Sequence, residues 1–187
     1  MIKTVLDACV LFGAPLRGWL LSLATDKVIA PFWSLEIQDE WTRSLLRKRS
    51  DLKREDLERT CRRMDFHFPN GLVHGYESMT PMLKLPDPND RHVLAVAIHV
   101  KAEYIITFNI EDFPQTILQH YGVEAIPPDE LIMRLIQQTA EPILQTAKKH
   151  RLSLTRPPKS VDEYLATLER QKLQKTVAFL REHKTEI

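Results

Sequence analysis

The chain has 187 residues, of which 43% are hydrophobic and 27% charged, and its formal net charge is +1. This is the composition of an ordinary globular protein, long enough to bury a sizeable core without disulfides or a structural metal. The near-zero charge excludes a polycation that coats nucleic acid nonspecifically, although basic and acidic patches can still stand side by side.

The two cysteines, Cys9 and Cys61, form neither a disulfide framework nor a zinc set. An apolar strand begins at Ile2, so we expect no signal peptide. The longest apolar stretches, such as residues 19–24, fall far short of the roughly 20 residues of a membrane span. We therefore expect a protein of the reducing cytoplasm with no membrane partner.

Two short strands, each followed by a helix, are predicted at the start of the chain. Residues 2–6 form an apolar run that ends at Asp7, and a leucine-rich helix follows. Residues 27–30 predict a second strand, which we expect Pro31 to end. Ser34 is a typical N-cap, and acidic residues in the first turn and basic residues in the last suit the dipole of the helix that follows.

Two more helices are predicted in the middle of the chain. Residues 51–64 alternate charged and apolar side chains, and a turn-rich connection follows at residues 71–75. A loop made rigid by two prolines leads to Asp90, which occupies an N-cap position. The helix of residues 91–101 is apolar on nearly all sides, and such helices are usually buried.

Two further strands are predicted at residues 104–107 and 123–126. Strands that alternate with helices indicate an α/β fold, here a three-layer α/β/α sandwich around a mainly parallel sheet. Ligands bind beyond the carboxyl ends of the strands in such sheets. Asp7, Asn109 and Asp112 follow predicted strands and therefore lie at that edge.

Beyond Asp129 the pattern becomes purely helical. An amphipathic helix is predicted over residues 131–147, and prolines at 157 and 158 interrupt the helical pattern. Ser160 and Glu163 form a capping box that opens another helix. We expect a last helix near the end of the chain, and we divide the chain into a domain of residues 1–129 and a helical extension of residues 130–187.

Three aspartates, Asp7, Asp90 and Asp112, adjoin segments that must be core. Carboxylates are rarely buried without a partner, yet each aspartate alone could be a turn or cap residue. Glu40 alone would count as part of a solvated helix face. These residues become informative only when their order along the chain is considered.

In that order, four blocks resemble the PIN-domain family over about the first 130 residues. They are Val5-Leu6-Asp7, Ser34 to Glu40, Asp87-Pro-Asn-Asp90-Arg-His-Val-Leu-Ala, and Thr107-Phe-Asn109-Ile-Glu-Asp112-Phe113. The last two blocks are the more specific. One departure from the family is Ala8-Cys9, where Thr-Asn is common, and this puts the polar surroundings of Asp7 in doubt.

The resemblance implies four carboxylates that are both catalytic and metal-binding, namely Asp7, Glu40, Asp90 and Asp112. It implies supporting roles for Asp87, Thr107 and Asn109. Ligation by oxygen alone suits Mg²⁺ or Mn²⁺. Such a metal lowers the pKa of a bound water, which would then attack a phosphodiester.

By resemblance, the chain is expected to be a metal-dependent endoribonuclease of the VapC-like toxin type. An RNA substrate, an inhibitory antitoxin and a homodimer are implied with it. The alternatives are a PIN-fold nuclease in RNA processing or on DNA, and a module that binds RNA or protein without catalysis. An Asp-x-Asp phosphatase is excluded because Cys9 stands two residues after Asp7, and no P-loop motif is present.

Several other residues have a functional and a plainer interpretation. The basic run of residues 47–49, with Lys53 and Arg54, could contact phosphates, but a solvated helix end is favoured. Core packing is favoured over base stacking for Trp33 and Trp41.

His92 and His99 share a helix face but lack further zinc ligands at suitable spacing. Structural or surface roles are favoured for both. Cys9 lacks a nearby base, so a buried apolar thiol is favoured over a nucleophile.

Overall fold

The computed structural model describes residues 1–187, and its backbone contacts divide the chain into two compact units. Unit 1 comprises residues 1–12 and 30–126, and unit 2 comprises residues 13–29 and 127–187. Unit 2 is therefore discontinuous in sequence, because it includes an early segment as well as the end of the chain. The assignment of residues 1–129 and 130–187 to separate domains stays a proposal.

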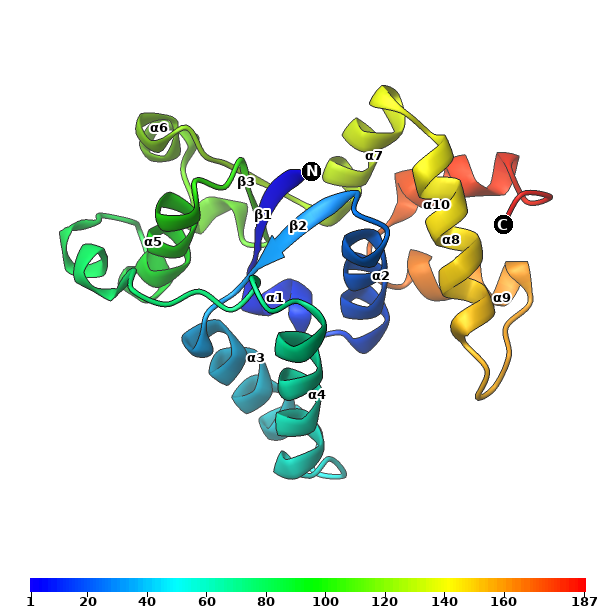
Figure 1. Ribbon diagram of the computed structural model, residues 1–187, viewed down its shortest axis with the longest axis horizontal. Coiled ribbons are helices and arrows are strands. Elements are labelled where there is room, and N and C mark those ends of the chain that lie inside the picture. Colours follow the sequence, from blue (N-terminus) through cyan, green and yellow to red (C-terminus); the bar gives the residue numbers. More distant parts are fainter. The chain divides into compact units, whose positions relative to one another are not determined.

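A four-stranded parallel sheet runs through the first unit in the order β2-β1-β3-β4 (Figure 1). The strands are β1 (Ile2–Leu6), β2 (Ile29–Phe32), β3 (Tyr104–Ile106) and β4 (Glu124–Ile126). Leu6 lies opposite Ile106, which lies opposite Ile126. The carboxyl ends of β1, β3 and β4 are thus in register, which confirms the predicted α/β class.

Strand β2 corrects one prediction, because the strand does not end at Pro31 but continues through it to Phe32. The order of the sheet explains this. β2 is an edge strand, and an edge strand tolerates a residue without an N–H group.

The helices of unit 1 pack around these strands. They are α1 (Ala8–Leu11), α3 (Leu35–Lys48), α4 (Arg54–His67), α5 (Arg91–Val100) and α6 (Gln115–Leu118), with short 3₁₀ turns η1 (Glu77–Met82), η2 (Pro88–Asp90), η3 (Ile110–Asp112) and η4 (Gln119–Tyr121). Helix α5 lies against β1 and β3, and α3 packs on α1 and α4 (Figure 1).

The sequence explains the placement of α3 and α5. Ser34 Oγ accepts a hydrogen bond from the Ile37 N–H at 3.2 Å, which confirms the predicted N-cap of α3. Ile37 and Trp41 then bury one side of that helix. Helix α5 is buried from His92 to Ala97, as its apolar composition predicts, so its amino end is fixed firmly beside the sheet.

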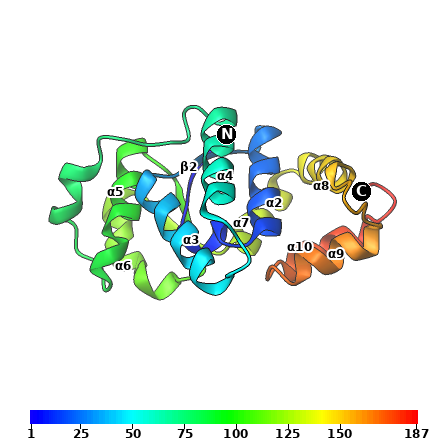
Figure 2. The same cartoon turned by 90° about the horizontal axis from the view of Figure 1, so that it is seen from below.

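The second unit consists of helices alone. These are α2 (Ala14–Thr25), α7 (Pro128–Gln138), α8 (Glu141–Ser153), α9 (Val161–Glu169) and α10 (Gln174–Glu182). Helix α2 contacts α8 and α9, and α10 contacts α7 and α9 (Figure 2). None of the helices in the protein is long and apolar enough to cross a lipid bilayer.

Two predictions about these helices have different outcomes. The prediction of a single helix over residues 131–147 is wrong. Helix α7 ends before Thr139, and a new helix, α8, begins with Pro142 in its first turn. Proline suits a first turn, where its missing N–H is not needed. The capping box is confirmed, since Ser160 and Glu163 each accept a hydrogen bond from the other's backbone N–H.

An aromatic cluster fills the centre of unit 2. The rings of Trp19, His150 and Tyr164 lie with centroids 5.6 to 6.4 Å apart. His150 Nδ1 lies 3.1 Å from the Tyr164 hydroxyl. Burial lowers the pKa of His150 to about 4, so this pair is neutral near pH 7.

Candidate functional site

Asp7 lies at the carboxyl edge of the sheet, where three hydrogen bonds hold its carboxylate. It follows β1 and is only 4% exposed. Its Oδ2 accepts hydrogen bonds from Thr107 Oγ1 at 2.6 Å and Cys9 Sγ at 3.1 Å, and its Oδ1 accepts one from the Ala8 N–H at 2.6 Å. These donors fix the orientation of the carboxylate.

Cys9 partly replaces the polar contact that the departure from the family pattern put in doubt. Its sulfur also accepts a hydrogen bond from the Phe108 N–H at 3.2 Å. Burial, together with the charge of Asp7, raises the pKa of the Cys9 thiol to about 12. The thiol therefore stays protonated and donates to Asp7, which is a more polar role than the apolar one we favoured from the sequence.

Asp90 stands at the N-cap position of α5, as predicted, but its side chain makes no capping hydrogen bond. The capping role belongs to Asp87, whose Oδ1 accepts a hydrogen bond from the Asn89 N–H at 2.8 Å. The plain interpretation as a cap therefore describes Asp87 rather than Asp90, whose carboxylate lines the cavity described below.

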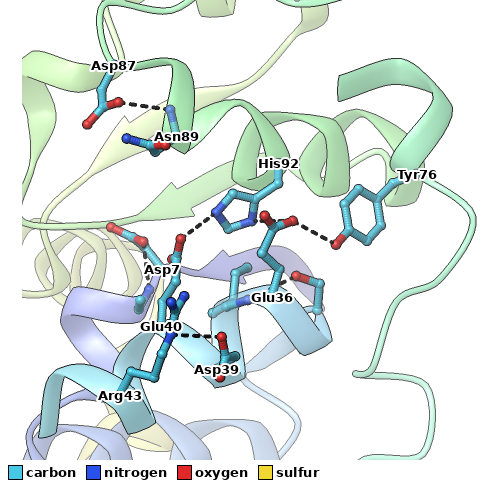
Figure 3. A network of polar contacts seen from close by, with 12 residues as sticks. Asp7, Glu36, Asp39, Glu40, Arg43, Tyr76, Asp87, Asn89 and His92 are labelled. Atoms are coloured by element: carbon cyan, nitrogen blue, oxygen red, sulfur yellow. Dashed lines mark hydrogen bonds and ion pairs between the residues drawn. The ribbon is translucent and has the colours of Figure 1, made fainter. Parts of the chain in front are cut away.

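Glu40 meets a buried histidine from the opposite side of the site (Figure 3). Its Oε1 lies 3.1 Å from Nε2 of His92, which is 1% exposed. The other ring nitrogen of His92 lies 3.7 Å from Oε2 of Glu36, an ion-pair distance too long for a hydrogen bond. Tyr76 in turn donates to Glu36 at 3.5 Å.

The carboxylates of this site lie close enough to repel one another, and the repulsion contributes to their pKa values. Burial, together with the charges of four neighbouring carboxylates, raises the pKa of Asp90 to about 7; these carboxylates are Asp7, Asp112, Asp87 and Glu40. Burial also raises the pKa of Asp7, against the hydrogen bonds of its donors, and the charge of Glu40 adds to the rise.

The pKa of His92 reflects the same charges. Burial alone would lower it, but the hydrogen bond and the charge of Glu40, helped by Glu36 and Asp7, raise it above its ordinary value. The neighbouring carboxylates thus favour the protonated form of the imidazole.

A cavity of about 930 Å³ opens over this group. Four of the predicted residues line it, namely Asp7, Glu40, Asp90 and Asn109. Asp87, Thr107 and Asp112 do not, although Thr107 contacts Asp7 directly and Asp112 acts on Asp90 through its charge. The structure therefore brings four of the seven predicted residues to one cavity, and the other three interact with Asp7 or Asp90.

The chemistry of the group fits a hard divalent cation. Its predicted ligands offer oxygen atoms alone, which suits Mg²⁺ or Mn²⁺, and the raised pKa of Asp90 shows charge that a cation would relieve. The side chains as they stand are too spread for binding, because no three His, Cys, Asp or Glu groups converge closely enough to hold a metal ion. Metal binding therefore stays a prediction.

Several residues that line the cavity were not among the predicted site residues. His92 was expected to be structural or on the surface, yet it lines the cavity against Glu40. Its position two residues after Asp90, at the start of a buried helix, was the available signal. Arg47 and Lys48, for which a solvated helix end was favoured over phosphate contacts, also line the cavity. Arg43 and Ser44 line it from the same half of α3. Trp33 and Trp41 are buried in the core, as predicted.

Comparison with known proteins agrees with this fold. Residues 3–111 match the family described as PIN domain. This match covers more than half of the chain, and the chain belongs to the PIN-domain family. Residues 128–182 match a second family, described as the VapC50 C-terminal domain.

One relative is "Putative ribonuclease VapC50" of Mycobacterium tuberculosis. It is 36% identical over 69 residues, which make up 35% of this chain and 40% of that protein. The match thus spans about two fifths of the relative's length. No solved structure matches the chain.

Proposed function

We propose that this protein is a metal-dependent endoribonuclease whose catalytic carboxylates are Asp7, Glu40, Asp90 and Asp112. The observation that carries the proposal is the raised pKa of Asp90, which results from burial and from the charges of the other three and of Asp87. Perturbed carboxylates in a cavity are typical of functional sites. Membership of the PIN-domain family and the name of the M. tuberculosis relative support the same conclusion.

The residues of the chain have separate tasks in this proposal. Asp7, held by its three donors, presents a fixed oxygen, and His92 orients Glu40 in the same way. Asp90 and Asp112 complete the set, with Asp87, Thr107 and Asn109 in support. A bound Mg²⁺ or Mn²⁺ would neutralise these carboxylates and supply an acidified water for attack on the phosphodiester.

We further propose that the protein is the toxin of a toxin–antitoxin pair. Its similarity to a protein named VapC50 supports this role. The partners would be an RNA substrate, an antitoxin and a second copy of the chain, all in the cytoplasm. A small antitoxin-like gene beside this one would favour the toxin over a nuclease of RNA processing.

The test is cleavage of labelled single-stranded and structured RNA, and of DNA, with Mn²⁺ or Mg²⁺. Asp7→Asn and Asp90→Asn should lose the cleavage, as should addition of EDTA. Asp51→Asn is the matched control, because Asp51 is exposed and pairs with Arg49 outside the cavity. Cleavage of DNA alone would favour a PIN-fold nuclease that acts on DNA. A folded wild type that cleaves nothing and binds no metal would leave a binding module as the better proposal.

A further inference from the structure

Helix α3 gives the cavity a second chemical character beyond the carboxylates. Glu36 and Glu40 line the cavity from its first half, and Arg43, Ser44, Arg47 and Lys48 line it from its second half. Residues four apart lie on one helix face, so acid and base form a continuous stripe. With a rise of 1.5 Å per residue, Lys48 lies about 12 Å beyond Glu40 along the helix axis.

Two of the basic residues on α3 and just after it are already neutralised. Arg43 Nε lies 2.8 Å from Asp39 Oδ2. Arg49 donates two hydrogen bonds, at 2.7 and 2.8 Å, to the carboxylate of Asp51. These cations have partners within the protein.

Arg47 and Lys48 have no carboxylate partner, although both line the cavity. Arg47 donates a hydrogen bond to Ser44 Oγ at 3.2 Å. The Lys48 ammonium stands 5.0 Å from the centre of the Phe12 ring, which also lines the cavity. Two available cations therefore stand beside a half-buried aromatic ring.

The geometry points to a nucleotide subsite formed by Phe12, Ser44, Arg47 and Lys48, where a phosphate of single-stranded RNA binds the two cations and its base stacks on the ring. This inference rests on the proposed function, because it assumes that the cavity receives RNA. The base would replace the Lys48 ammonium over the ring, since stacking on an aromatic side chain is a stronger contact than an exposed cation–π pair. The released ammonium then pairs with the phosphate.

This subsite assigns a substrate class. A base can stack on Phe12 only when it is unpaired, so the site selects single-stranded segments. It also offsets the repulsion between RNA phosphates and the carboxylates further along α3. The RNA is thus held at a distance from the carboxylates by residues that take no part in the chemistry.

Binding in EDTA tests the subsite separately from cleavage. The probe is a fluorescein-labelled oligouridine of about ten nucleotides, followed by anisotropy over a range of salt concentrations. Arg47→Gln with Lys48→Gln should weaken binding about tenfold or more and flatten the salt slope by about 1.4. Phe12→Leu should weaken binding about fivefold but leave an abasic oligomer unaffected.

Arg49→Gln is the matched control, because it removes one cation next to α3 outside the cavity. It should leave affinity within about twofold of the wild type. An equal loss in Arg49→Gln and the double variant, or competition by polyglutamate as strong as that by unlabelled RNA, overturns the subsite. Cleavage in Mn²⁺ is scored separately, so a protein that binds through the subsite but cuts nothing overturns only the proposed function.

Discussion

Aspartates in the two units have opposite pKa shifts. In unit 2, Asp26 accepts hydrogen bonds from Lys149 at 2.8 Å and Thr146 at 2.7 Å, and these lower its pKa despite some burial. In unit 1, the pKa values of Asp7 and Asp90 are both raised. Asp26 is thus neutralised by groups of its own unit, whereas Asp7 and Asp90 lie near other carboxylates whose charges a bound cation would offset.

The largest expected effect is on RNA cleavage, where substitutions of Asp7 and Asp26 are compared. Asp7→Asn should reduce RNA cleavage by about a thousandfold or more, because it removes a ligand and a charge from the proposed metal site. Asp26→Asn should leave the specific activity of the folded protein unchanged. Initial rates with a labelled RNA in Mn²⁺ give the comparison, and equal losses in both variants would contradict it.

The next effect concerns stability in acid. The folded pKa of His150, about 4, lies below its ordinary value of about 6.5. Its stabilising contribution is therefore complete above pH 6.5 and is lost as the pH falls toward 4, by up to about 3 kcal/mol. Urea unfolding between pH 7.5 and 4.5 should show this slope in the wild type.

A His150→Gln variant provides the control for that slope. Its absolute stability will also change because the aromatic cluster is altered, so the change with pH is the quantity to compare. If the variant loses stability in acid as steeply as the wild type, another group is responsible.

His92 should have an intermediate effect on cleavage. His92→Leu removes the contact that orients Glu40, and we expect the rate to fall about 10- to 100-fold, as for other residues that orient metal ligands. His92→Gln keeps a donor and should recover part of the loss. The readout is kcat at saturating Mn²⁺, and identical rates in the leucine variant and the wild type would exclude a positioning role.

The smallest expected effect is a loss of stability as the pH rises, which is opposite in direction to the effect of His150. A carboxyl group whose folded pKa is raised to about 7 costs stability as the pH rises from about 4 through 7. Asp90→Asn should therefore stabilise the metal-free protein at pH 8 by about 1 kcal/mol, after allowance for solvent screening. Mn²⁺ should raise the Tm of the wild type more than that of the variant, and thermal melts with and without EDTA test both points.

The sequence could predict the strands because these depend on local patterns. The four carboxylates could be proposed only through the resemblance of their order along the chain to the PIN-domain family. It could not predict that Asp87 caps the turn while Asp90 does not, since the two aspartates stand in one short loop and either could be the cap. Pro31 was misassigned because only the strand order shows that β2 is an edge strand. His92 was missed because an apolar helix pattern does not show which polar residue faces a carboxylate on α3.

The discontinuity of unit 2 has a consequence for synthesis on the ribosome. Trp19 emerges early, but its aromatic partners His150 and Tyr164 lie more than 130 residues later in the chain. At roughly 5–20 residues per second, helix α2 must wait for the order of ten seconds before its apolar side can be covered. During that time the nascent chain presents a hydrophobic surface, which makes α2 the segment that a chaperone should protect.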